Sequence, residues 1–218
     1  KGRLGSTALL PGKLPEQADG YTIAIGVGDA SVYYKYMASD RLWDETAAAG
    51  AATELRNMPI VLEYSTDTGQ YHLNTEYWET RQSGDADNNP EPHFVGRRLT
   101  GIGYFQGRLV LLCGEYVHMS ATNKPYRFFR SSVALLKDDD PIEVASTREL
   151  DDDLVHAVQY NSNLVLFGKR TQAVVPGGTV LTPRNTMIDI AARHEVDTSI
   201  KPVLSGRSLM FAVRISHP

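Results

Sequence analysis

The stretch YFQGRLVLLCGEYVHMSA, residues 104–121, contains three apolar runs separated by two short turns. Gln106-Gly107-Arg108 and Cys113-Gly114-Glu115 each carry a glycine, a residue that tight turns favour. The stretch therefore predicts strand, turn, strand, turn, strand. Its middle run, LVLL at 109–112, is continuously apolar rather than alternating, which is typical of a strand buried on both faces.

The same order of apolar runs and glycine-containing turns recurs twice further along the chain. LVLF begins at 164 inside QYNSNLVLFGKRTQAVVPG, and LMF begins at 209 inside VLSGRSLMFAVRIS, so the three runs start at 109, 164 and 209. A meander that returns about every 40 to 50 residues is typical of β-propeller blades. Frequent hairpins in any all-β protein would give a similar pattern, and that alternative stays open.

The first third of the chain predicts a separate antiparallel β-domain. YTIAIGV (21–27) and SVYYKYM (31–37) flank Gly28-Asp29-Ala30, and MPIVLEY and QYHLNTEYW flank Asp67-Thr68-Gly69. Both pairs are typical of hairpins. DETAAAGAATEL, residues 44–55, is the main helical candidate, although Gly50 and the missing apolar stripe make a long loop with a short helix an equal alternative. The fold class is therefore all-β, with this domain followed by propeller-like blades of antiparallel meanders.

Composition limits the possible functions. The 218 residues are 42% hydrophobic and carry a net charge of −4, so the chain can bury a core but shows no basic excess for gripping nucleic acid. The aromatic and basic run KPYRFFR (124–130) is too small a patch to change this. Cys113 is the single cysteine and is expected to be buried and inert. No apolar run is long enough for a membrane span. The chain lacks an initial methionine, and we expect a fragment of a longer protein.

SGDADNNPEPHFVGRR, residues 83–98, raises the question of a metal site. Asp85, Asp87 and Asn89 match the first ligand positions of a calcium loop, but its required glycine is Pro90 and its required glutamate is Gly96. Aspartate and asparagine also favour turns, and proline extends the residue before it. We therefore expect a linker at 85–92 between a β-domain at 1–84, whose last strand carries Tyr77 and Trp78, and a propeller-like domain at 93–218. Such a linker should be exposed and mobile, and Gly96 should allow a close backbone approach after it.

Other chemistry is not indicated. The six histidines form no HxxxH or HxH pair and there is no CxxC, so no local zinc site is expected. The runs Asp138-Asp139-Asp140 and Asp151-Asp152-Asp153 could supply the acid and base of a polysaccharide hydrolase, for example through Asp139 and Asp152. Solvated turn residues are the simpler interpretation. The prediction is that the chain is not an enzyme and has no catalytic residue, metal or cofactor.

The segment 78–129 resembles the signature stretch of tail tubular protein B, the nozzle protein family of short-tailed podovirus bacteriophages. Further matches lie in LLKDDDPIEVAST (135–147), HAVQYNSNLVLFGKRTQAVV and GGTVLTPRN, so the resemblance covers roughly residues 20–212. The signature residues that we expect to be structurally important are Trp78, Gly84, Asp85, Asn89, Pro90, Pro92, Phe94, Gly96, Asp140 and Pro141.

This resemblance implies a structural protein of the virion, located in the phage tail. The family is expected to form a six-fold ring of identical copies below an adaptor (gatekeeper) ring, to carry tail fibres, and to line the channel through which DNA leaves without specific binding. Two alternatives remain at this point. One is a hydrolase acting on host capsule polysaccharide, and the other is a generic carbohydrate- or protein-binding propeller.

Overall fold

The computed structural model describes residues 3–51, 55, 58–74, 78–145 and 152–214. These residues form an all-β structure with three short 3-10 helices, η1 (Thr7–Leu9), η2 (Glu16–Ala18) and η3 (Gly28–Ala30). The chain forms two compact units: Lys1–Glu91 with Phe129–Lys137, and Pro92–Phe128 with Asp138–Pro218. The return of residues 129–137 to the first unit had no signal in the sequence. Within the described residues, no helix is both long and apolar enough to cross a membrane.

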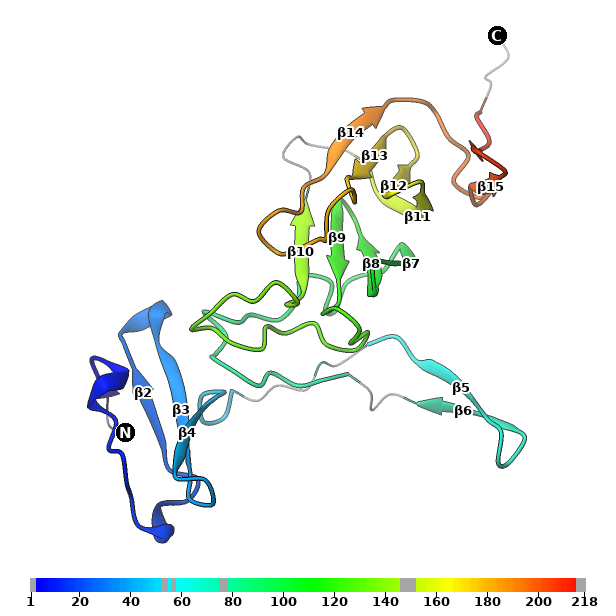
Figure 1. Ribbon diagram of the computed structural model, residues 1–218. Coiled ribbons are helices and arrows are strands. Elements are labelled where there is room, and N and C mark those ends of the chain that lie inside the picture. Colours follow the sequence, from blue (N-terminus) through cyan, green and yellow to red (C-terminus); the bar gives the residue numbers. More distant parts are fainter. Residues whose placement is uncertain (1–2, 52–54, 56–57, 75–77, 146–151, 215–218) are drawn as a thin grey trace. The chain divides into compact units, whose positions relative to one another are not determined.

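The first unit contains a four-stranded sheet in the order β1-β2-β3-β4 (Figure 1). Its strands are β1 (Arg3–Leu4), β2 (Thr22–Ile25), β3 (Val32–Met37) and β4 (Leu42–Thr46). β1 is parallel to β2, and the other neighbours are antiparallel. The expected hairpin around Gly28-Asp29-Ala30 is confirmed, with β2 pairing to β3. Ile23, Ile25 and Val27 occupy alternating positions in the sequence; Ile23 and Ile25 are buried, whereas Val27 lies beyond the strand and is exposed.

The helical prediction for 44–55 is wrong where the structure describes it. Asp44, Glu45 and Thr46 lie in β4 and pair with β3, with Lys35 opposite Asp44. Alanine content raises helix propensity, but pairing with an aromatic-rich strand outweighs that weak local preference. Residues 52–54 lie outside the described part of the chain.

The second hairpin of the first unit consists of β5 (Val61–Ser65) and β6 (Gln70–Asn74). It confirms the hairpin expected around Asp67-Thr68-Gly69, and it forms a two-stranded sheet of its own (Figure 1). The expected continuation of the second strand to Trp78 is wrong at its end, because Trp78 lies outside a strand. Tyr77 lies outside the described residues.

The stretch 104–121 forms the centre of the first sheet of the second unit. β7 (Gly101–Phe105), β8 (Arg108–Cys113), β9 (Tyr116–Met119) and β10 (Ile142–Ala145) are successive antiparallel neighbours. Gln106 and Gly107 both have positive φ, +46° and +74°, as a tight two-residue hairpin turn requires. Val110, Leu111 and Leu112 are all buried, so the prediction from the continuous apolar run is confirmed.

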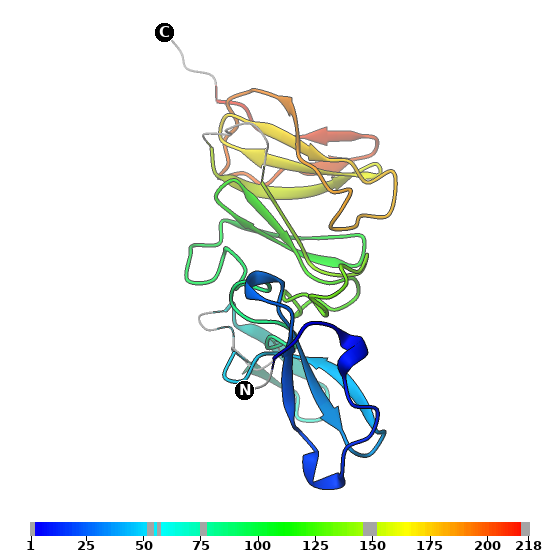
Figure 2. The same cartoon turned by 90° about the vertical axis from the view of Figure 1, so that its left-hand side faces the viewer.

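The repeat at 159–177 forms the corresponding sheet. β11 (Leu154–Tyr160), β12 (Asn163–Gly168), β13 (Gln172–Val175) and β14 (Asp189–Ala192) again follow one another in sequence order. Figure 2 shows this sheet lying beside the first sheet of the unit. The third copy gives only a hairpin, β15 (Val203–Ser205) with β16 (Ser208–Met210). No closed propeller or barrel is formed by the described residues.

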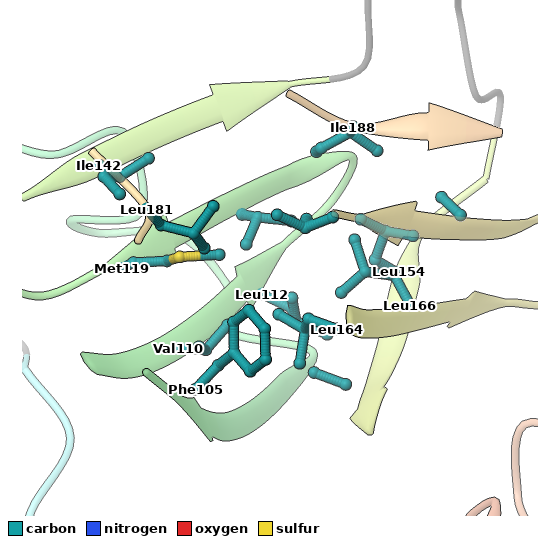
Figure 3. Close-up of a cluster of buried hydrophobic side chains, with 14 residues drawn as sticks. Phe105, Val110, Leu112, Met119, Ile142, Leu154, Leu164, Leu166, Leu181 and Ile188 are labelled. Atoms are coloured by element: carbon teal, nitrogen blue, oxygen red, sulfur yellow. The ribbon is translucent and has the colours of Figure 1, made fainter. Parts of the chain in front are cut away.

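The two four-stranded sheets of the second unit, β7 to β10 and β11 to β14, share one buried core. Val110 and Leu112 of β8 pack in the same cluster as Leu164 and Leu166 of β12, with Met119 at one side (Figure 3). The sheets approach most closely at β7, where a Cβ on Gly101 would lie 2.1 Å from the backbone oxygen of Val155. Glycine is therefore required there to let the two backbones meet.

Candidate structural site in the signature segment

The segment 83–91 folds as a turn held by its own side chains. The Asp85 carboxylate accepts hydrogen bonds from the backbone N–H groups of Asp87 (3.0 Å) and Asn88 (3.3 Å). The Asn88 side-chain oxygen accepts from the N–H of Asp85 at 2.9 Å. Gly84 has φ +72°, and a Cβ there would lie 2.2 Å from that Asn88 oxygen. These contacts are the turn chemistry expected of aspartate and asparagine.

Asn89 is the buried centre of the segment, with 2% of its surface exposed. Its side-chain NH2 donates to the carbonyl oxygens of Ser83 (2.9 Å) and Arg130 (3.1 Å). Its side-chain oxygen accepts from the N–H of Arg130 at 3.1 Å. An amide has two donor hydrogens and one acceptor oxygen, so this environment satisfies all of them. Asn89 therefore joins two segments that are 41 residues apart.

Arg81 fixes the same segment from its other side. Its Nε donates to the carbonyl of Asn89 at 2.7 Å, and Nη1 donates to the carbonyl of Ala51 at 2.6 Å. The guanidinium lies over the ring of Phe129, 4.9 Å from the ring centre. A buried cation that is hydrogen-bonded to carbonyls and stacked on an aromatic face favours a unique geometry.

Glu45 of β4 binds the returning segment 129–137. One carboxylate oxygen accepts from the Ser132 hydroxyl and the other from the N–H of Val133, both at 2.6 Å. Short hydrogen bonds to an ionised acceptor are the strong class. Glu45 had been assigned to the helical candidate, so its role as an acceptor could not be seen from the sequence.

Asp85 also contacts β3. The Tyr33 hydroxyl donates to Asp85 Oδ2 at 2.8 Å, and this bond, together with burial, raises the pKa of Tyr33. Burial raises the pKa of Asp85, but the bonds from Tyr33 and from two backbone N–H groups outweigh burial and leave it below its ordinary value. Asp85 is therefore an ionised acceptor at neutral pH.

The segment is only partly exposed, so the expectation of an exposed linker is wrong for part of it. Ala86, Asp87, Pro90 and Glu91 are exposed, whereas Gly84, Asn89 and Pro92 are buried. Trp78 is also buried and donates its indole N–H to the carbonyl of Pro59 at 3.1 Å. Asparagine and proline suggest an exposed loop by composition. The buried Asn89 side chain instead hydrogen-bonds to backbone groups that would otherwise lack a partner.

Phe94 and Gly96 stand at the start of the second unit. The Phe94 ring meets His118 (centroids 4.9 Å apart) and Phe128 (5.1 Å) edge to face. Gly96 has φ +73° with nothing near its missing Cβ, so it is required for backbone conformation rather than for a close approach. This corrects the close approach that the sequence suggested at Gly96.

Histidines gather beside Phe94. The rings of His93 and Tyr116 stack with centroids 4.0 Å apart, and His118 lies next to them. Glu143 Oε2 accepts from the backbone N–H of His93 at 3.0 Å and lies 3.2 Å from His118 Nδ1. Burial, and secondarily Arg97, lowers the pKa of His93. Within the described residues, no three or more histidine, cysteine or acidic side chains are arranged to hold a metal.

Cys113 is buried, as predicted. Burial raises the pKa of its thiol, so the unreactive protonated form is favoured at neutral pH. Cys113, together with His93, Arg97, Tyr116 and Asp153, lines an open hollow of about 400 Å³.

Arg108 is a buried cation of the second unit, with 1% of its surface exposed. Its Nη1 donates to the carbonyls of Ser120 and Asp140, both at 2.7 Å, and Nη2 donates to the carbonyls of Asp138 (2.9 Å) and Leu181 (3.2 Å). Burial lowers the pKa of Arg108. The sequence identifies Arg108 only as a turn residue, because carbonyl acceptors have no residue-type signature.

Asp140 and Pro141 end the acidic run and precede β10. Asp140 is fully buried, and its backbone oxygen is one of the four acceptors of Arg108. Its neighbours differ: Asp138 pairs with Arg184 (2.9 Å) and Asp139 with Arg127 (3.2 Å). The run therefore fixes a loop end around Arg108.

The carboxylates of the hydrolase hypothesis have structural partners. Besides the pairing of Asp139 with Arg127, Asp152 Oδ2 accepts from the N–H groups of Arg170 (2.5 Å) and Thr171 (2.9 Å). These bonds link the segment just before β11 to the turn between β12 and β13. Asp151 lies outside the described residues.

A family model and a known protein both match this chain. The family model described as bacteriophage nozzle protein matches residues 8–217. The chain is 32% identical over 208 residues to tail tubular protein gp12 of Escherichia phage T7. That alignment covers 92% of this chain and 26% of the T7 protein, so the chain spans about a quarter of its relative's length. The match covers nearly the whole chain, and the chain therefore belongs to the bacteriophage nozzle protein family.

Proposed function

We propose that this chain forms part of the wall of a tube, built from several identical copies, through which phage DNA leaves the virion. As a member of the nozzle family, the chain is a structural component of a phage tail. The observation that carries the proposal is the family match over residues 8–217. The printed name of the T7 relative describes a tubular tail protein, and closed rings of identical copies are the usual way to build a tube.

The proposed assembly is a six-fold ring that contacts an adaptor (gatekeeper) ring and tail fibres. The likeness to the nozzle family supports these partners. The passing DNA is a further proposed neighbour, held without specific binding. A channel wall that bound phosphates through lysine and arginine would release counterions and slow the DNA. The net charge of −4 agrees with a wall that does not bind the duplex.

We propose that the two sheets of the second unit are successive blades of a propeller. Each is a four-stranded antiparallel meander in sequence order, and they share one buried core. The hairpin β15–β16 would begin a third blade. The T7 relative is longer than this chain, and further blades would come from the rest of such a protein.

We also propose that residues 85–92 are a joint between an N-terminal β-domain at 1–84 and the domain at 93–218. The change of compact unit between Glu91 and Pro92 supports the joint. Because Asn89 is buried, the first half of this joint packs as part of the N-terminal domain.

A purely structural role agrees with the partners of the acidic residues. Asp139 and Asp152 bind an arginine and two backbone N–H groups, so no observation favours a hydrolase. No observation favours a generic binding propeller either.

Electron microscopy of the intact virion protein that contains this sequence tests the proposal. We expect ring-shaped particles, and gold-labelled antibodies against residues 92–145 should mark the tail of the virion. Labelling of the capsid alone, or a protein that stays monomeric at millimolar subunit concentration, would contradict the proposal.

A further inference from the structure

The hairpin β5–β6 has one apolar face that is exposed. Leu62 lies opposite Leu73 and Tyr64 lies opposite Tyr71 in the register of the two strands. Side chains of directly opposite residues share a face, and the Tyr64 and Tyr71 rings contact one another with centroids 5.1 Å apart. The four exposed fractions are 62% for Leu62, 73% for Leu73, 53% for Tyr64 and 69% for Tyr71.

The other face of the hairpin is polar. Glu63 lies opposite His72, and Ser65 lies opposite Gln70. The hairpin is therefore amphipathic, as a strand pair is when one face packs against a protein surface. Within the described residues, the extensive contacts of β5 and β6 are only with each other. An isolated two-stranded hairpin is marginally stable in water, so covering the apolar face would stabilise it.

The exposed area is a large part of what one side of an interface requires. With about 200 Å² for a residue of this size, the four exposed fractions leave roughly 500 Å² of surface. A specific interface buries about 800 Å² of each partner, so this face alone supplies more than half of one side. Tyrosine is also enriched in interface cores, while charged residues are depleted, and this face carries two tyrosines and no charge.

We propose that the face formed by Leu62, Tyr64, Tyr71 and Leu73 packs against a second copy of this chain's protein. The inference rests on the proposed tube of identical copies. In a ring, each copy offers one patch to the next copy, and the contact is repeated at every interface. An exposed apolar patch of this size is often a functional surface. In a ring, the neighbouring copy would cover this face on every subunit.

Site-specific photo-crosslinking on the intact, assembled protein tests this contact. Leu73 is replaced by the photo-reactive residue p-benzoylphenylalanine, and the assembled rings are irradiated and separated by denaturing electrophoresis. We expect covalent pairs of the protein, at least tenfold more abundant than from the same residue at His72. His72 is the matched control because it neighbours Leu73 but lies on the polar face. Mass spectrometry of the cross-linked peptides verifies that the link joins two copies.

Three results would overturn the inference. The first is that the photo-reactive residue at position 73 cross-links only within its own copy, or only to a different virion protein. Another is equal yields from Leu73 and His72, which would mean that the apolar face has no special role. The third is normal ring formation by the folded double variant Leu62→Asn, Leu73→Asn, where we expect at least a tenfold loss of rings relative to Glu63→Gln. An unsubstituted protein that forms no rings would contradict the proposed function itself.

Discussion

The side-chain amide of Asn89 binds both backbone groups of Arg130, donating to its carbonyl and accepting from its N–H, each at 3.1 Å. The amide thereby reproduces the pairing that a strand residue would make. Because the side chain is buried, water cannot replace these bonds. The contact explains why an asparagine, rather than another turn residue, stands between Asn88 and Pro90.

Substitution of Asn89 by alanine should strongly destabilise the first unit. Its loss leaves the backbone groups of Arg130 and the carbonyl of Ser83 without their partner, which should cost about 3 kcal/mol of unfolding free energy. Urea unfolding followed by tryptophan fluorescence measures this. Asp87→Ala in the same turn is the control, since Asp87 is exposed, and should change stability by no more than about 0.5 kcal/mol. Equal effects of the two substitutions would refute the role of Asn89.

Arg108→Lys should destabilise the second unit by about 3 kcal/mol, the scale for disrupting a buried charged group. A lysine has a single ammonium and cannot reach four carbonyls that are arranged for a guanidinium fork. The control is Arg184→Lys, because Arg184 is half exposed in its pair with Asp138 and should cost less than about 1 kcal/mol. The denaturant midpoints of both variants measure these losses of stability. A larger loss for Arg184→Lys than for Arg108→Lys would contradict the prediction.

Gly101→Ala should separate the two sheets of the second unit. The new methyl group would lie 2.1 Å from the carbonyl oxygen of Val155, and relief of that overlap needs a backbone shift costing about 3 kcal/mol. Gly178→Ala is the matched control, since nothing lies within 4 Å of its missing Cβ. Thermal unfolding should show a clear fall in Tm for the first variant only. An unchanged Tm in Gly101→Ala would mean that the sheets are not packed this closely.

The parts of the fold that could be predicted were those with local signals. The continuous LVLL and LVLF runs and the turn at Gln106-Gly107 identified both meanders, because turn chemistry and strand burial depend on residues close together in sequence. The signature residues were selected by likeness to a family, and their physical roles differ. Asn89 is a buried hydrogen-bonding centre, whereas Pro90 is exposed.

The parts that could not be predicted depend on distant partners. Glu45 binds a segment 88 positions away, and Arg108 binds carbonyl oxygens, which every residue possesses. Neither contact can be recognised from a pattern of residue types in the sequence. The helical interpretation of 44–55 failed for a related reason, because the pairing partner of Glu45 lies in β3 and local propensity does not report it.

Acid should destabilise the second unit through His93. Burial holds the pKa of His93 in the folded protein below its ordinary value of 6.5, so the unfolded chain takes up the proton more readily. The contribution of His93 to stability is therefore complete above about pH 6.5 and falls as the pH drops from there toward the folded pKa. Arg97 and His118 oppose protonation of the ring, while Glu143 and Glu115 favour it.

His93→Phe separates this effect from other titrating groups. Phenylalanine preserves the stacking on Tyr116 and does not titrate. Unfolding free energies of both proteins at pH 7.5 and 5.5 give the measurement. We expect the fall between these pH values to be smaller in the variant. The prediction is wrong if the two proteins lose the same stability.

Duplex DNA should bind negligibly to this chain at physiological salt, whatever its sequence. The net charge is −4, and binding to phosphates needs clustered lysine or arginine, each contact adding to the salt dependence. The adjacent Arg97 and Arg98 line one hollow, but Glu115 and Asp153 line it too and offset their charge. Gel shifts with a random duplex at about 0.15 M salt test this. The charge-reversing pair Glu115→Lys, Asp153→Lys should bind measurably more DNA than the natural chain. Submicromolar affinity of the natural chain would contradict a wall that lets the genome pass.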